Sequence, residues 1–177
     1  MTASMERLCD WVVNKDKVWV HGDRITDGHI ALDMRLTPGV DPGEVARDGQ
    51  WVLRKAQPSR WVAEQHPDLS DVIPDSGDGS DWNEVAWSAW VTRGLRIGAL
   101  RGAVVAVDDG WLSRLQPGYR IEGAPGHGIL RIVTKKPDRP SLLAGGAVHR
   151  TVVGVVMPVS IEGSAAVLEA IVQDLTV

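Results

Sequence analysis

Apolar positions recur along the chain with two spacings, one typical of helices and one typical of strands. Near the N-terminus Thr2 or Ser4 can cap a predicted helix, whose apolar face holds Met5, Leu8, Cys9, Val12 and Val13. The same spacing predicts a second helix ending at Gly94, with an apolar face of Trp82, Val85, Ala86, Ala89 and Trp90. A third amphipathic helix is predicted after Ser164, with Val167, Leu168, Ile171, Val172 and Leu175 on its apolar face.

Between the helices the pattern predicts short strands. Ile30, Leu32, Met34 and Leu36 alternate with Ala31, Asp33 and Arg35, so we expect a strand with one buried and one solvated face. A short helix is expected at 109–115, and further strands at 18–20, 50–55, 59–64, 95–100, 103–108, 119–123, 129–134, 141–145 and 151–161. This order of elements predicts an α+β fold in which antiparallel sheets dominate and a few short helices pack on them.

The composition of one segment predicts a linker. Residues 64–84 contain seven acids and neither lysine nor arginine, with several prolines and glycines among them. That composition favours a solvated linker, centred on 75–81. A calcium loop is a poorer interpretation, because neither Gly77 nor Gly79 has an acid five residues before it. We therefore expect two halves and a C-terminal helical extension, at 1–74, 82–161 and 162–177.

The net charge of −4 is unevenly distributed. Residues 1–92 hold 9 basic and 16 acidic residues, a net charge of −7, whereas residues 93–150 hold 10 basic and 4 acidic residues, a net charge of +6. Such asymmetry indicates either a surface for a polyanion or charges that pair across the fold. The first interpretation predicts non-specific contacts to double-stranded DNA from Arg93, Arg96, Arg101, Arg114, Arg120, Arg131, Lys135 and Lys136.

The chain has a single cysteine, Cys9, which excludes an internal disulfide framework and fits a reducing cytosol. Its place on the apolar face of a predicted helix argues against a catalytic nucleophile. No stretch approaches the roughly 18 apolar residues of a membrane span, and charges interrupt the N-terminal segment too often for a signal peptide. We therefore expect a cytoplasmic protein with no membrane partner.

Four side chains form a candidate metal site: His21, Asp23, Asp27 and His29. Each His–Asp pair lies on one strand face, because side chains repeat every two residues. Both pairs would have to converge across a hairpin to bind a metal, which would suit a metal-dependent hydrolase. Asp27-Gly28 is also a strong hairpin signal that needs no metal. We expect no metal, no cofactor and no catalysis, with the hydrolase as the alternative.

Three separated stretches together resemble a known family. The stretches are "ITDGHIAL" (25–32), "HPDLSDVIP" (66–74), and "AVVAVDDGWLSRLQ" (103–116) followed by "VVGVVMPVSI" (152–161). In this order they resemble segments of the bacterial β sliding clamp, the ring-shaped processivity factor of replicative DNA polymerase. The resemblance implies a clamp-like fold in a bacterial or phage protein of DNA replication, here in a short form.

In that family these stretches line a pocket for linear peptides of polymerases, repair proteins and the clamp loader. Carried over, the resemblance implies a peptide-binding site made of Thr26, Gly28, His29, Leu32, Pro74, Val156, Met157 and Pro158. A groove of aliphatic side chains with a flexible methionine suits a short apolar peptide independently of any resemblance. We expect a binding protein, acting as a processivity factor or clamp-related adaptor, with homo-oligomerisation as a further expectation.

The chain also departs from the family. Ile30 and Ser160 stand where the family usually has arginine, which puts some polar peptide contacts in doubt. The family's three-domain chain is considerably longer, and it ends at the strand that corresponds to 152–161. A second alternative is therefore a small phage-type interaction module without a replication role, which would use its C-terminal helix to bind a partner.

Overall fold

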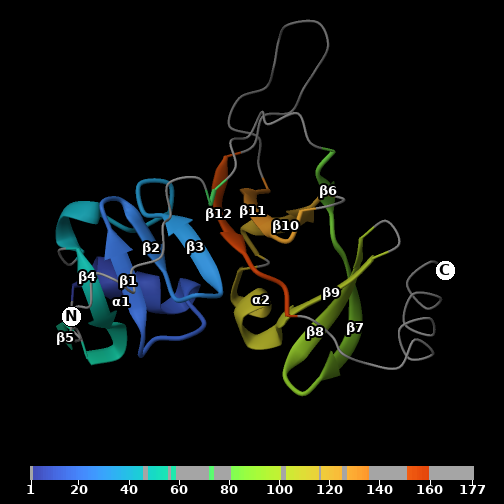
Figure 1. Cartoon of the computed structure of the whole chain (residues 1–177), viewed down its shortest axis with the longest axis horizontal. Coiled ribbons are helices and arrows are strands. Elements are labelled where there is room, and N and C mark those ends of the chain that lie inside the picture. The colour runs from blue at the N-terminus through green and yellow to red at the C-terminus, as the bar shows by residue number, and fades with distance from the viewer. Residues whose placement is uncertain are drawn as a thin grey trace, which may run out of the picture.

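The computed structural model describes residues 2–45, 48–55, 57–58, 72–73, 81–100, 103–115, 117–124, 127–135 and 151–159. The fold is α+β with antiparallel sheets, as the sequence predicts. Its described helices are α1 (Ala3–Trp11) and α2 (Asp109–Leu115). Helix α1 lies beside the strands of the N-terminal half and α2 beside those of the C-terminal half (Figure 1). Two short 3-10 helices follow β3 and β4, namely η1 (Pro42–Glu44) and η2 (Leu53–Lys55).

A nine-stranded antiparallel sheet runs through the described part of the molecule in the order β5-β4-β1-β2-β3-β12-β11-β10-β6. Its strands are β1 (Val18–His21), β2 (Arg24–Thr26), β3 (Ile30–Asp33), β4 (Gly49–Val52), β5 (Gln57–Pro58), β6 (Asn83–Glu84), β10 (Tyr119–Gly123), β11 (Leu130–Thr134) and β12 (Val152–Val156). A second sheet has the order β7-β8-β9, with β7 (Ala86–Thr92), β8 (Leu95–Leu100) and β9 (Ala103–Asp108).

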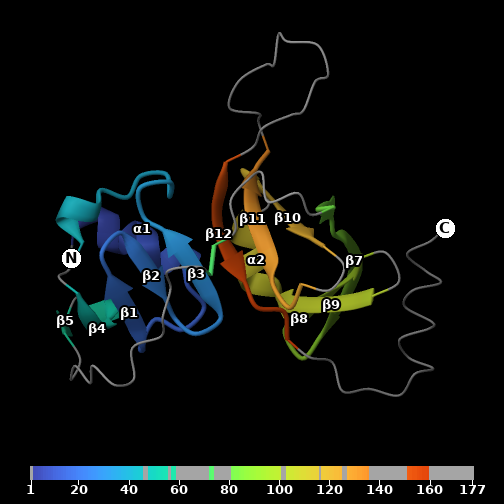
Figure 2. The ribbon, with the colours of Figure 1, turned by 45° about the horizontal axis from the view of Figure 1, so that its top comes forward.

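The two halves of the chain join where β3 pairs with β12 (Figure 2). Leu32 lies opposite Gly154 and Ile30 opposite Val156, so one sheet continues from the N-terminal half into the C-terminal half. Beside this junction β12 carries an irregularity, because Ile132 pairs with Gly154 while the next residue of β11 pairs with Val152. Buried residues of α1, α2 and the strands of both halves pack together in one large hydrophobic cluster.

The N-terminal helix forms as its apolar spacing predicts. Thr2 is its N-cap, and the Thr2 side chain accepts a hydrogen bond from the backbone N–H of Met5. Its C-terminal residue, Trp11, meets α2, where the indole Nε1 of Trp111 donates to the Trp11 carbonyl over 2.6 Å. Both indoles are buried, so the helices are tied together inside the core.

The prediction of a helix over 82–94 is wrong: this segment forms β6 and β7. Its apolar residues fit a helical spacing, but β7 pairs with β8 at both ends, with an irregularity between Trp87 and Val91. Arg93 and Gly94 form the two-residue turn between them, with φ of 49° and 79°, as primed hairpin turns require. Gly94 is therefore a hairpin residue. The pairing of β7 with β8 therefore outweighs the helical spacing of the apolar residues, which is a weak determinant by itself.

The predicted strand 30–36 is shorter than expected and lacks a solvated face. β3 ends at Asp33, and all four of its residues are buried. Ala31 lies beside its β12 partner Val155, and Val72 and Ile73 pack against this pair. Alternating apolar and polar residues predict a solvated strand face only where no other segment packs on it. Here distant segments pack on both faces of β3.

Several predictions lie outside the described residues: the strands at 59–64 and 141–145, the helix in 162–177, and the linker at 75–81 except for its last residue, Asp81. The remaining predicted elements from 95 to 134 are present as β8, β9, α2, β10 and β11. Neither helix of the described residues has the length and apolar character needed to cross a bilayer.

Candidate functional site

The turn between β2 and β3 is organised around the carboxylate of Asp27. One carboxylate oxygen accepts hydrogen bonds from the backbone N–H groups of His29 and Ile30, both at 2.8 Å. The other accepts from Val13 and Asn14, both at 2.7 Å, just beyond the end of α1. Asp27 is 4% exposed. This buried carboxylate therefore holds the turn against the N-terminal helix.

Thr26 and Gly28 complete the turn. The Thr26 hydroxyl donates to the carbonyl of Ile30 over 2.6 Å and accepts from the backbone N–H of Gly28 over 3.1 Å. Gly28 has a φ of 88°, a conformation that side chains disfavour. Because Thr26 is buried, it shapes the turn rather than offering its side chain to a ligand.

The structure brings this turn against the end of β12. The backbone N–H of Met157 donates to the carbonyl of His29 over 2.7 Å, which extends the β3–β12 pairing by one bond. Met157 is 55% exposed and Val159 is 41% exposed, while Pro158 is half-buried. The exposed His29 and these three residues lie along the turn and the end of β12, and we call them the β12-end patch: His29, Met157, Pro158 and Val159.

The other residues of the predicted peptide site are placed differently. Leu32 is 0% exposed and Val156 is 3% exposed, so both belong to the hydrophobic core and do not line an open groove. Pro74 lies outside the described residues. Val159 is absent from the predicted set, and its exposure follows from the chain leaving the sheet after β12, where its N–H donates to the Ala106 carbonyl over 2.8 Å.

Three of the four candidate metal ligands engage other groups of the fold, and the fourth, His29, is exposed. His21 lies 3.4 Å from Asp48, and Asp23 lies 3.4 Å from Arg35. Asp27 already accepts the four backbone bonds that hold the turn. The described residues contain no cluster of three or more histidine, cysteine or carboxylate side chains suited to a metal ion.

Three of the arginines predicted to contact DNA form ion pairs within the fold. Arg96 pairs with Asp109 through its Nε at 2.6 Å. The other two pairs are Arg120–Glu84 at 2.9 Å and Arg131–Glu122 at 2.7 Å. The Arg131 guanidinium also lies 4.5 Å from the centre of the Trp82 ring.

The remaining basic residues are placed variously. Arg93 and Lys135 are exposed, and Arg114 donates to the Asp10 carbonyl over 3.2 Å. Arg101 and Lys136 lie outside the described residues. Three of the eight residues predicted to contact DNA are therefore paired with acids of the same fold.

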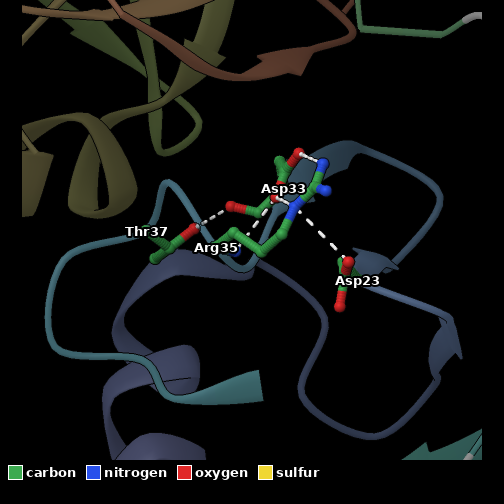
Figure 3. Close-up of polar contacts among 4 residues, drawn as sticks. All are labelled: Asp23, Asp33, Arg35 and Thr37. Atoms are coloured by element: carbon green, nitrogen blue, oxygen red, sulfur yellow. Dashed lines mark hydrogen bonds and ion pairs between the residues drawn. The ribbon is translucent and has the colours of Figure 1, made fainter. Parts of the chain in front are cut away.

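A polar cluster at the end of β3 is missing from the sequence-based prediction (Figure 3). Arg35 binds both oxygens of Asp33, at 3.0 Å and 2.6 Å, and lies beside Asp23. The Thr37 hydroxyl donates to the Asp33 carbonyl over 2.8 Å. The hydrogen bond from Arg35 holds the pKa of Asp33 below its usual range, against the opposing effect of burial. This cluster lies at the C-terminal end of β3, the strand that follows the turn 26–29.

The cluster leads to a prediction on acid stability. Because the pKa of Asp33 is lower in the folded chain, its carboxylate contributes stability above its unfolded pKa, and this is lost as the pH falls through the folded pKa. We expect Arg35→Gln to lower the free energy of unfolding at about pH 6 and to have much less effect at about pH 3. Urea unfolding at both pH values measures this. Arg93→Gln, at the β7–β8 turn, is the control, and an Arg35→Gln effect independent of pH would contradict the prediction.

Comparisons with protein-family models, with curated proteins and with solved structures found no match to this chain.

Proposed function

We propose that this chain is a clamp-related binding protein of DNA replication, which holds a linear peptide segment of a polymerase or repair partner on the β12-end patch. The observation that carries the proposal is the contact between the turn 26–29 and the end of β12. These two stretches are far apart in the sequence, yet the Met157 N–H donates to the His29 carbonyl. They are also the stretches that resemble the peptide-binding segments of the sliding clamp.

The chemistry of the patch supports binding of an apolar peptide. Met157 is unbranched and polarizable, so it adapts to different aliphatic or aromatic side chains. The Pro158 ring and Val159 extend the apolar area, and His29 adds a polar group beside it. The turn beneath is held by the buried Asp27, so the patch sits on a rigid support. These groups suit recognition and offer no arrangement of nucleophile and base.

DNA contact and ring formation are further properties that the resemblance implies. The ion pairs of Arg96, Arg120 and Arg131 reduce the charge available for phosphates. Any DNA binding is therefore expected to be weak, independent of sequence and steeply reduced by salt.

A peptide with a bacterial clamp-binding motif is expected to bind with a Kd of about 1–100 µM, since ordering costs offset much of its burial. We expect Met157→Ala to weaken this binding by about 1–2 kcal/mol, because the methionine side chain is covered in the complex. Isothermal titration calorimetry on the full chain measures both. Val91→Ala removes another exposed apolar side chain, 45% exposed on β7, and should leave the affinity unchanged. Equal affinities of wild type and Met157→Ala, or no binding by the folded wild type, would refute the proposal.

A further inference from the structure

A cavity of about 350 Å³ lies between α1, α2 and the start of β10. Its lining residues are Arg7, Asp10, Trp11, Pro38, Arg114, Leu115, Gly118 and Tyr119. None of them belongs to the β12-end patch, so this cavity is separate from the proposed peptide site. Its volume lies at the lower end of the range of small-molecule sites, roughly 300–1,000 Å³.

One side of the cavity is apolar and preformed. Trp11 and Leu115 are buried, and the Trp11 ring meets Tyr119 edge to face with centroids 4.7 Å apart. Pro38 adds a rigid apolar ring to the lining. The Trp111 indole fixes the position of Trp11 through its hydrogen bond to the Trp11 carbonyl. This apolar side of the cavity is therefore held in place by two helices.

The polar groups of the cavity favour an anion. It contains two guanidinium groups and one carboxylate, Asp10. The pairing of Arg7 with Asp10 is loose, at 3.8 Å between exposed groups. Arg114 donates through Nε to the Asp10 carbonyl, and within the described residues it forms no ion pair. The charged side chains of the lining therefore sum to a net charge of +1.

Tyr119 adds a neutral hydrogen-bond donor. Burial raises the pKa of its phenol above the ordinary value, which is itself well above physiological pH, so the hydroxyl is a donor there. A protonated phenol can donate to an anion beside the guanidinium groups.

We propose that this cavity is a binding site for a small carboxylate with an aromatic or branched apolar body. The apolar part lies against Trp11, Pro38 and Leu115. The carboxylate faces the guanidinium groups of Arg7 and Arg114, with the Tyr119 hydroxyl as an additional donor. Arginine suits this role because its planar fork of N–H groups matches the two oxygens of a carboxylate.

The probes that test this site are phenylacetate, 2-phenylethanol and 2-phenylethylamine, which share a ring and differ in charge. We expect phenylacetate to bind the full chain with a Kd of about 1 mM, typical of a fragment of this size. The alcohol should bind at least about tenfold more weakly, and the amine should not bind, because each loses the ion pair. Chemical-shift changes in the nitrogen–proton NMR spectrum measure affinity and location together, and should concentrate at the amides of Gly118 and Tyr119.

Substitutions then test which arginine binds the carboxylate of phenylacetate. Arg114→Gln is expected to weaken phenylacetate binding about tenfold, Arg114→Lys less, and Arg7→Gln severalfold. Arg114→Gln could perturb the end of α1, whose Asp10 carbonyl accepts from Arg114. Arg7 is exposed, so Arg7→Gln tests the role of the guanidinium groups without that effect. Arg93→Gln, outside the cavity, should bind as the wild type does. No binding of phenylacetate at about 10 mM, equal binding of all three probes, or unchanged affinity in both glutamine variants would overturn the proposal.

Discussion

Asp27→Asn is expected to lower the free energy of unfolding by about 3–5 kcal/mol, because the buried carboxylate accepts four backbone hydrogen bonds. An asparagine side chain has one oxygen, and its NH₂ group would face two of the four N–H donors. Those two donors would be left without an acceptor, at a cost of about 1–3 kcal/mol each. The remaining two bonds would also lose their charge assistance. Urea unfolding measures the change.

Asp41→Asn is the matched control for this substitution. Asp41 is exposed, and its carboxylate accepts one hydrogen bond in its own turn, from the backbone N–H of Gly43 at 2.8 Å. We expect its replacement to cost less than about 1 kcal/mol, since the freed N–H group reaches water. Similar losses in both variants would show that Asp27 is not the centre of the turn. A metal role for Asp27 would instead predict that the effect of its substitution depends on added metal.

Gly154→Ala is expected to lower the free energy of unfolding by about 2–3 kcal/mol, because β3 leaves no room for a methyl group. A Cβ at this position would lie 2.3 Å from the backbone oxygen of Ala31 and 3.0 Å from the Cα of Leu32. Both are backbone atoms of the strand that β12 pairs with, so relief requires β3 and β12 to separate. The β12-end patch depends on that pairing.

Gly118→Ala provides the comparison, because a Cβ there would meet no atom within 4 Å. Thermal and urea unfolding of both variants test the prediction. If Gly154→Ala is as stable as Gly118→Ala, the close approach of β3 and β12 is incorrect. We also expect Gly154→Ala to weaken peptide binding, which Gly118→Ala should leave unchanged.

Local signals predict much of the fold correctly. Thr2 is the cap of α1, and Asp27-Gly28 marks a real turn between β2 and β3. The elements from β8 to β11 match their predicted positions closely, since each is bounded by a clear turn or proline signal. What fails is the choice between helix and strand for 82–94, where tryptophans and alanines fit a helical spacing and the deciding factor is pairing with β8.

The candidate sites depend on contacts that local pattern cannot supply. The interpretation of Leu32 and Val156 as groove residues misses that both face the core. The prediction of a solvated face on β3 does not foresee that Val72 and Ile73 pack against Ala31 and its partner Val155. The cavity between α1 and α2 joins Arg7 to Arg114, and no periodicity relates residues so far apart. Similarly, the alternation places Asp33 and Arg35 on the same face of the predicted strand, which the pattern predicts to be solvated. The pattern alone therefore does not reveal the ion pair between them.

The β3–β12 junction sets an order of events during synthesis. The β3 edge is translated before about 120 further residues and meets its partner only when β12 emerges. At roughly 5–20 residues per second, the nascent N-terminal half waits on the order of 10 s with an unpaired strand edge. Such an edge is a template for pairing with other chains. β3 is only four residues long and ends at the Asp33–Arg35 ion pair, so the ribosome-bound intermediate presents a short, charge-terminated edge that resists aggregation.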